Sequence, residues 1–307
     1  PEFVQSFLPG IDQVLNWFIN RIDRKTGLLG KVEYWNFVDW ADEWPWDNKL
    51  RIGGVPKGGR NIDGQSSIVT MQLAYAVQRA AELNDYFDQP VQAEKYKQLA
   101  QYLTQSVNQS CWDTSRNYLA DTPDKTEFTM HAQIFGVLTN TIPENEQKAM
   151  VERIMNDPKL IQPTLYFRFY LTQALKKTGL ADRYLATLGP WKDMVKNGLS
   201  TFAEKQDPTR SDCHAWSASP NYDFLATVAG IRPASPGFKT IRMEPAFGDL
   251  KFIKGQMPHP SGLIVFNLKR TGTTGIQGEV TLPEGLTGTF GWNGKTLQLK
   301  GKTVIDL

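Results

Sequence analysis

The spacing of the apolar residues changes near Gly230, and no other feature constrains the fold of this chain as strongly. Before this point apolar residues recur every three or four positions, as they do in amphipathic helices. After the Pro- and Gly-rich segment 230–245, apolar and polar residues alternate in short runs between Gly-containing turns, as they do in strands. The sequence therefore predicts a mainly α domain at 1–230 and a small antiparallel β-sandwich at 231–307.

Helices are predicted throughout the first domain. The first carries apolar residues from Phe7 to Ile22 at helical spacing. A second begins after Asp63, which we expect to cap it. Helix pairs that return in succession, with long loops between some of them, favour an α/α barrel whose loops gather around a cleft. The other predicted helices lie at 90–111, 127–139, 144–156, 163–178, 181–197 and 217–229.

The composition narrows the class of partner. The 34 basic and 32 acidic side chains are interspersed and give a net charge of +2, which favours neither nucleic acid nor an anionic membrane surface. The sequence contains no run of about 18 apolar residues, so no membrane-spanning helix is predicted. The two cysteines, Cys111 and Cys213, lack the spacing of a zinc site or a disulfide framework. We expect two free, mostly buried thiols, no metal and no organic cofactor.

Four of the nine tryptophans lie in the segment 33–46, EYWNFVDWADEWPW, within the long loop 28–62, which we call the Trp loop. Their spacing fits neither a helix nor a strand. Indole rings with interleaved Asp and Glu are typical of carbohydrate sites, because sugar C–H faces stack on the rings while hydroxyls bind carboxylates. The alternative is a Trp-rich turn that packs against a neighbouring helix.

A second polar loop, residues 198–216, precedes the last predicted helix, and we call it the Glu204 loop. It brings together Glu204, Asp207, Asp212, His214 and Trp216 within a short stretch. Hydrolysis of a glycoside needs two carboxyl groups, and in the inverting mechanism one of them is a general base that activates water. Glu204 is the candidate for that base. A solvated surface glutamate is an equally good interpretation of the residues alone.

Several segments carry a resemblance to a known family. They are GLSTFAE at 198–204, DCHAWSASP at 212–220 and ATVAGIRPASPGFKTIRMEP at 226–245, together with LPGIDQVLNWF, YWNFVDW and PTLYFRFYLTQAL earlier in the chain. In this order they resemble the later part of the α-L-rhamnosidases of glycoside hydrolase family 78. The resemblance implies an inverting glycoside hydrolase that cleaves terminal α-L-rhamnosyl residues from a rhamnose-containing carbohydrate.

The resemblance also implies roles for residues of both loops. Glu204 matches the general base, and His214 matches a histidine that contacts the sugar. Asp39 and Trp40 match a sugar-binding acid and an aromatic platform. The remaining predicted walls of the sugar site are Trp35, Trp44, Trp46 and Trp216. We expect His131 to pack in the core and His259 to be structural.

One part of the family pattern is not matched in this chain. The family's general acid lies upstream of the first helix, and neither Asp42 nor Glu43 matches it. An (α/α)6 barrel needs about twelve helices, whereas about eight are predicted here. The first three residues, Pro1-Glu2-Phe3, resemble the scar left by a vector cloning site. We therefore expect an incomplete barrel that is inactive alone. We also expect it either to self-associate or to cover the gap by a movement of the first helix, Phe7 to Ile22. The alternatives are a non-catalytic carbohydrate-binding protein and an α/α-barrel hydrolase acting on another deoxy sugar or a uronide.

Overall fold

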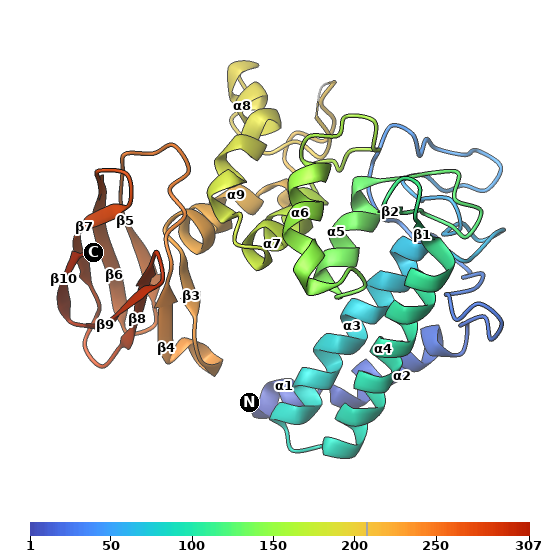
Figure 1. The fold of residues 1–307 in the computed structure, drawn as a ribbon, viewed down its shortest axis with the longest axis horizontal. Helices are drawn as coiled ribbons and strands as arrows, with labels where there is room; N and C mark the ends of the chain where they lie inside the picture. The colour runs from blue at the N-terminus through green and yellow to red at the C-terminus, as the bar shows by residue number, and fades with distance from the viewer. Residues whose placement is uncertain (207) are drawn as a thin grey trace. The chain divides into compact units, whose positions relative to one another are not determined.

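The computed structural model describes residues 1–206 and 208–307, so Asp207 of the Glu204 loop lies outside the described residues. The chain divides into two compact units, Pro1–Thr178 and Gly179–Leu307. The predicted domain boundary at 230 falls inside the second unit, where helices give way to strands (Figure 1).

The first unit is helical, as predicted. Most predicted helices are found within a few residues of their expected ends, and one matches at both ends, Pro90–Cys111. A short hairpin of β1 (Trp112–Asp113) and β2 (Tyr118–Leu119) follows it. The helices are α1 (Glu2–Gln5), α2 (Leu8–Ile19), α3 (Ser67–Tyr86), α4 (Pro90–Cys111), α5 (Met130–Leu138), α6 (Glu144–Ile154) and α7 (Arg168–Lys177).

The predicted cap of α3 is wrong. Ser66 is the N-cap, and its hydroxyl accepts a hydrogen bond from the backbone N–H of Val69. Asp63 lies outside the helix because its carboxylate accepts from the Gly64 N–H and pairs with Arg60. Asp and Ser are both good N-cap residues. Asp63 is not available as the cap because its carboxylate binds Gly64 and Arg60 instead.

The core of the first unit forms where α3 and α4 lie side by side (Figure 1). Small residues of α3 allow the two backbones to approach, and larger residues of α4 fill the space between them. The central α5 is buried along its whole length. The core residues where α3 and α4 meet are Leu73, Ala74, Val77 and Ala81 of α3 and Tyr96, Ala100 and Leu103 of α4.

The second unit starts with short helical pieces. The predicted helix 181–197 begins as a 3-10 helix, Ala181–Leu188, and continues as α8 (Gly189–Lys196). The predicted helix 217–229 is broken into a 3-10 turn, α9 (Ser219–Asp223) and a π-helical turn, Phe224–Val228. In the π turn the Ala229 N–H donates to the carbonyl of Phe224, five residues earlier, at 3.0 Å.

Two four-stranded sheets complete the second unit (Figure 1). Their strand orders are β10-β7-β6-β5 and β3-β4-β8-β9. The strands are β3 (Ile231–Pro233), β4 (Thr240–Met243), β5 (Phe252–His259), β6 (Gly262–Thr271), β7 (Gly275–Thr281), β8 (Thr287–Trp292), β9 (Lys295–Lys300) and β10 (Lys302–Asp306).

The prediction that all strands pair antiparallel is wrong at one place. β4 and β8 pair in parallel, with Ile241 opposite Gly288. The chain builds β5, β6 and β7 in the other sheet between these two strands, so β8 returns to β4 by a crossover and not by a hairpin. His259, at the end of β5, bonds through Nε2 to the carbonyl of Phe238, which agrees with the structural role expected for it.

The two cysteines differ in exposure. Both are free thiols, as predicted, but only Cys111 is buried. Burial raises the pKa of the Cys111 thiol to about 12. Cys213 is exposed on the Glu204 loop, so the expectation of a second buried thiol is wrong. Among the residues that the structure describes, no helix is both long enough and apolar enough to cross a membrane.

Candidate active site

Asp39 fastens the Trp loop to the rest of the first unit. Its carboxylate is fully buried and accepts hydrogen bonds from four donors. Oδ2 accepts from His131 Nε2 at 2.8 Å and from the backbone N–H of Thr164 at 2.7 Å. Oδ1 accepts from the Thr164 hydroxyl and from the backbone N–H of Trp40. The carboxylate thus joins the loop to α5 and to the segment before α7.

His131 continues this connection toward the tryptophans. Its ring is fully buried, as predicted, and lies between the rings of Trp44 and Phe167, with centroid distances of 4.7 and 4.4 Å. Nε2 faces the Asp39 carboxylate and therefore carries the ring proton, while Nδ1 has no hydrogen-bond partner among residues 1–206 and 208–307.

The Trp loop closes on itself at Gly54. The carbonyl of Gly54 accepts from the N–H groups of Val38 and Asp39, and its own N–H donates to the Trp44 carbonyl at 2.9 Å. The residue has a φ of +64°, and an added Cβ would lie 2.5 Å from the Phe37 ring. Only glycine fits both the conformation and the space.

The four predicted tryptophans divide into buried and exposed members. Trp44 is only 5% exposed and packs in the core, whereas Trp35 and Trp46 are 47% and 48% exposed. Trp35 holds its position by donating from Nε1 to the Gly53 carbonyl at 2.7 Å. Its ring centroid lies 5.6 Å from that of Trp46 and 6.0 Å from that of Trp40. The loop therefore offers a clustered aromatic surface to solvent.

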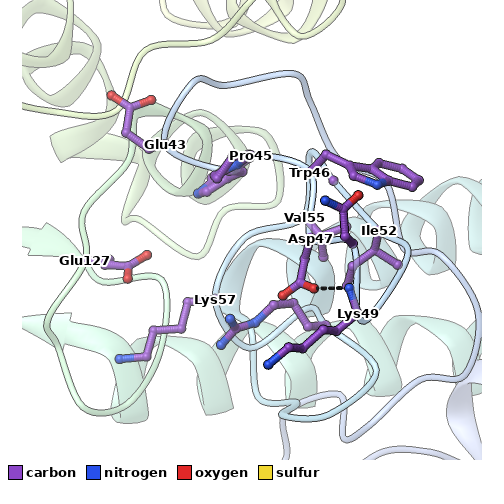
Figure 2. Close-up of a pocket in the computed structure, with 13 residues that line it drawn as sticks. Glu43, Pro45, Trp46, Asp47, Lys49, Ile52, Val55, Lys57 and Glu127 are labelled. Carbon is purple, nitrogen blue, oxygen red and sulfur yellow. Dashed lines mark hydrogen bonds between the residues drawn. The ribbon is translucent and has the colours of Figure 1, made fainter.

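A pocket of about 660 Å³ opens beside this surface (Figure 2). Trp44 and Trp46 line it together with charged side chains, and the indole N–H of Trp44 is buried without a hydrogen-bond partner among the described residues. Trp35 lies instead in a second, apolar hollow of about 360 Å³ against α2 and α3. The charged residues of the larger pocket are Glu43, Asp47, Lys49, Lys57, Arg60 and Glu127.

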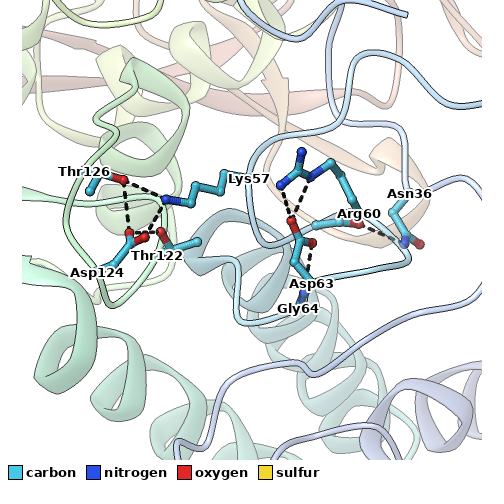
Figure 3. A network of polar contacts seen from close by, with 9 residues as sticks. Asn36, Lys57, Arg60, Asp63, Gly64, Thr122, Asp124 and Thr126 are labelled. Carbon is cyan, nitrogen blue, oxygen red and sulfur yellow. Dashed lines mark hydrogen bonds and ion pairs between the residues drawn. The ribbon is translucent and has the colours of Figure 1, made fainter. Parts of the chain in front are cut away.

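Ion pairs fix the rim of the larger pocket (Figure 3). Lys57 binds Asp124 and the hydroxyl of Thr126, which ties the Trp loop to the loop before α5. The hydrogen bond from Lys57 lowers the pKa of Asp124 to about 2. Arg60 pairs with Asp63, three residues further along the chain, at 2.7 Å. The pocket therefore keeps its shape through contacts that the sequence pattern did not predict.

The Glu204 loop of the second unit is a small closed structure. The Glu204 N–H donates to the carbonyls of Arg210 and Ser211, at 3.0 and 3.1 Å, so the chain turns back on itself over these residues. Two further hydrogen bonds join the two arms of the loop. The His214 N–H donates to the Phe202 carbonyl, and the Ser217 hydroxyl donates to the Ala203 carbonyl, both at 2.6 Å.

Within this loop the structure brings together Glu204, His214 and Trp216. The Trp216 indole donates to the Glu204 carbonyl at 3.0 Å, and the rings of Trp216 and His214 lie 4.4 Å apart. The sequence analysis missed Arg210, whose Nε and Nη2 hold the two oxygens of the Glu204 carboxylate at 3.0 and 3.1 Å. The guanidinium therefore fixes the position of the carboxylate that is the candidate base.

No cluster of three or more His, Cys, Asp and Glu side chains that could hold a metal ion occurs within residues 1–206 and 208–307. The two loops offer carboxylates, aromatic rings and hydrogen-bond donors. The predicted residues form two groups, one in each unit: Asp39 and the four tryptophans of the Trp loop, and Glu204 with His214 and Trp216.

Comparison with solved structures gives several rhamnosidases. A rhamnosidase of glycoside hydrolase family 78 from Bacillus sp. GL1 matches 94% of this chain with a TM-score of 0.76 at 20% identity. The α-L-rhamnosidase of Streptomyces avermitilis, solved with L-rhamnose, matches all of it with a TM-score of 0.74 at 15% identity. A rhamnosidase from Klebsiella oxytoca with rhamnose bound matches 71% with a TM-score of 0.59 at 22% identity. At such identities the likeness shows the fold.

This chain covers 31%, 31% and 41% of the length of those three relatives. A search of curated proteins gave no match. Family models, in contrast, match almost the entire chain. The bacterial alpha-L-rhamnosidase 6 hairpin glycosidase domain matches residues 1–228, and the bacterial alpha-L-rhamnosidase C-terminal domain matches residues 230–301. The helical region is thus part of a six-hairpin glycosidase domain, and the chain belongs to the α-L-rhamnosidases of glycoside hydrolase family 78.

Proposed function

We propose that this chain forms part of an inverting glycoside hydrolase that releases terminal α-L-rhamnosyl residues, with Glu204 as its general base. The observation that carries the proposal is the Arg210–Glu204 pair, which holds the Glu204 carboxylate by both oxygens in the loop that also contains His214 and Trp216. The Glu204 side chain is 13% exposed, so it keeps a path to water. Membership of the rhamnosidase family supports the choice of substrate.

In the proposed reaction Glu204 removes a proton from a water molecule. The water oxygen attacks the anomeric carbon while the bond from that carbon to the leaving oxygen breaks. A carboxylic acid on the opposite face of the sugar donates a proton to the leaving oxygen, at roughly 6.5–9.5 Å from the base. The family pattern places that acid upstream of the segments matched here, so we propose that this chain alone has no activity. The helices would then be part of an (α/α)6 barrel and the two sheets a β-sandwich.

We propose that the Trp loop supplies the sugar-binding surface. The exposed faces of Trp46 and Trp35 can stack on a sugar, and a deoxy sugar with its methyl group presents more apolar surface than a fully hydroxylated one. The carboxylates of Glu43 and Glu127 can accept hydrogen bonds from hydroxyls in the larger pocket, where Figure 2 shows them away from Trp46. Two of the solved relatives carry rhamnose.

The test is kinetic and uses the full-length protein that contains this chain. Glu204→Ala should lower kcat on an aryl α-L-rhamnoside by about three orders of magnitude with little change in KM, because the base acts only in the transition state. Azide should restore part of the rate by replacing the activated water. Asp212→Asn, in the same loop, is the matched control and should leave kcat near that of the wild type. A near-normal kcat for Glu204→Ala would remove Glu204 from the role.

A non-catalytic carbohydrate-binding protein is the second candidate. All lining residues of the pocket beside Trp44 belong to the first unit, so it can bind a ligand without any contribution from Glu204. Calorimetry with L-rhamnose distinguishes the two: binding without turnover in the full-length protein, unchanged by Glu204→Gln, would favour the binder.

A further inference from the structure

We propose that Asp39 is a positioning residue, which fixes the tryptophan walls of the larger pocket and does not itself contact the ligand. The resemblance to the family implied a sugar-binding acid at this position. The surroundings of Asp39 support a different role, and the inference rests on the proposed function only in the final step that links the pocket to a sugar.

The Asp39 carboxylate has no capacity left for a ligand. An ionised carboxylate offers about four acceptor positions, and here the four donors from His131, Thr164 and Trp40 occupy them. The residue is 0% exposed. A sugar hydroxyl could reach it only after one of these buried hydrogen bonds had broken, which would leave a donor unsatisfied.

The contacts of Asp39 lead directly to the pocket. His131, which donates to Asp39, packs its ring against Trp44 at 4.7 Å, and Trp44 lines the pocket. On the other side, Asp39 receives the N–H of Trp40, whose ring lies near that of Trp35. The segments that meet here are separated by 92 residues at His131 and 125 at Thr164. One carboxylate therefore sets the position of a long loop that has no helix or strand of its own.

The charge of Asp39 is essential to this arrangement. Oδ2 receives the backbone N–H of Thr164, and Oδ1 receives the backbone N–H of Trp40. Neither donor can turn into an acceptor. In Asp39→Asn the amide nitrogen replaces one of the two oxygens, so whichever way the amide points, its N–H group faces a backbone N–H. The isosteric substitution should therefore loosen the loop without removing any volume.

A second buried acid of the same unit provides a matched control. Asp121 is also 0% exposed, but only Oδ1 of its carboxylate has a hydrogen-bond partner among the described residues, the Thr129 hydroxyl at 2.9 Å. Asp121→Asn thus changes a buried carboxylate to an amide at a site that does not hold the aromatic cluster.

The experiment records indole N–H signals of the ¹⁵N-labelled protein by NMR, first without ligand. Trp44→Phe identifies the signal of Trp44. We expect Asp39→Asn to shift the Trp44 signal and to increase its exchange with water by about tenfold, as for the loss of one buried hydrogen bond. Thr164→Val, which removes only the hydroxyl donor, should shift it less, and Thr164→Ser should restore the wild-type position. Asp121→Asn should leave the Trp44 signal unchanged.

Titration with L-rhamnose then follows on the same samples. We expect Asp39→Asn to weaken binding by about tenfold, in proportion to the change of the Trp44 signal. Weaker binding with an unchanged ligand-free Trp44 signal would show that Asp39 touches the sugar, and would overturn the inference. An equal Trp44 shift in Asp121→Asn would overturn it too, because the effect would then be general.

The two proposals can fail separately. If the full-length wild-type protein binds no rhamnose but Asp39→Asn still shifts the Trp44 signal, the positioning role stands and the proposed substrate is wrong. If Asp39→Asn does not fold, Thr164→Val and Thr164→Ser decide the question: a shift in the valine variant that serine abolishes supports the inference, and identical signals in all three proteins contradict it.

Discussion

Asp39 is buried inside the first unit, where its carboxylate accepts four hydrogen bonds. Glu204 lies on a loop of the second unit, where its carboxylate pairs with the guanidinium of Arg210. Both acids are close to tryptophans, and the sequence analysis gave both to the sugar site. They differ in the solvent that reaches them. Asp39 is fully buried, while the Glu204 side chain is 13% exposed and the Arg210 side chain that holds it is 53% exposed.

This difference decides what each carboxylate can do. A buried carboxylate must keep all its partners, because each donor that loses it stays unsatisfied in the interior. It is therefore suited to hold parts of a protein together. A carboxylate that water can reach exchanges partners at little cost, and a general base must meet a new water molecule in every turnover. Burial thus supports a positioning role for Asp39 and a chemical role for Glu204.

The largest expected effect is a difference in stability between the two sites. Asp39→Ala leaves buried donors of His131, Thr164 and Trp40 without an acceptor, and should lower the free energy of unfolding by about 3–5 kcal/mol. Glu204→Ala breaks a partly exposed pair and should cost within about 1 kcal/mol. Urea unfolding followed by circular dichroism measures both. Similar losses at the two sites would break the comparison.

The sequence predicted the elements better than the contacts between them. The helix 90–111 matches α4 at both ends, because Pro90 supplies an N1 signal and apolar residues keep a regular period after it. The start of α3 was misplaced because Asp63 and Ser66 are both suitable caps, and only the pairing of Asp63 with Arg60 decides between them. The spacing of apolar residues locates a helix approximately. It does not show which of two polar side chains pairs elsewhere and which one caps the helix.

The candidate site shows the same limit over longer distances. Asp39 and His131 were interpreted separately, as a sugar ligand and as a core residue, although they form one buried pair 92 residues apart. No local pattern signals a long-range pair of this kind. Arg210 was missed for a simpler reason: it follows Glu204 by six residues in a loop without a repeat, and only the turn of the chain brings the two together.

A smaller effect is expected at Asp121, the second buried acid of the first unit. Burial raises the pKa of Asp121 well above its ordinary value of 3.8, and the side-chain and backbone hydrogen bonds from Thr129 oppose this only in part. The folded state therefore binds a proton more tightly than the unfolded state does. Its contribution to stability is complete below the ordinary pKa and is lost as the pH rises through the folded-state pKa, by at most about 1.4 kcal/mol per pH unit.

Asp121→Asn removes this proton and should remove that part of the pH dependence. Urea unfolding of wild type and variant between about pH 4 and 7 measures it, with the variant gaining stability relative to the wild type as the pH rises. Parallel pH profiles would show that Asp121 ionises as easily inside the protein as in the unfolded chain. Burial alone would then not distinguish it from an exposed carboxylate.

The smallest expected effect uses salt to compare the buried and exposed sites. Arg210→Gln removes the cation that holds Glu204 and should lower the free energy of unfolding by less than about 1 kcal/mol at low ionic strength, because the pair is partly solvated. In about 1 M NaCl, where the screening length falls to roughly 3 Å, most of that difference should vanish. The loss caused by Asp39→Ala should stay the same in both solutions, since ions do not reach a fully buried carboxylate. Arg183→Gln, at an exposed arginine of the same unit, serves as the control for a simple change of net charge. A salt-independent loss in Arg210→Gln would mean that its pair with Glu204 behaves as a buried contact, and Glu204 would then share the positioning role proposed for Asp39.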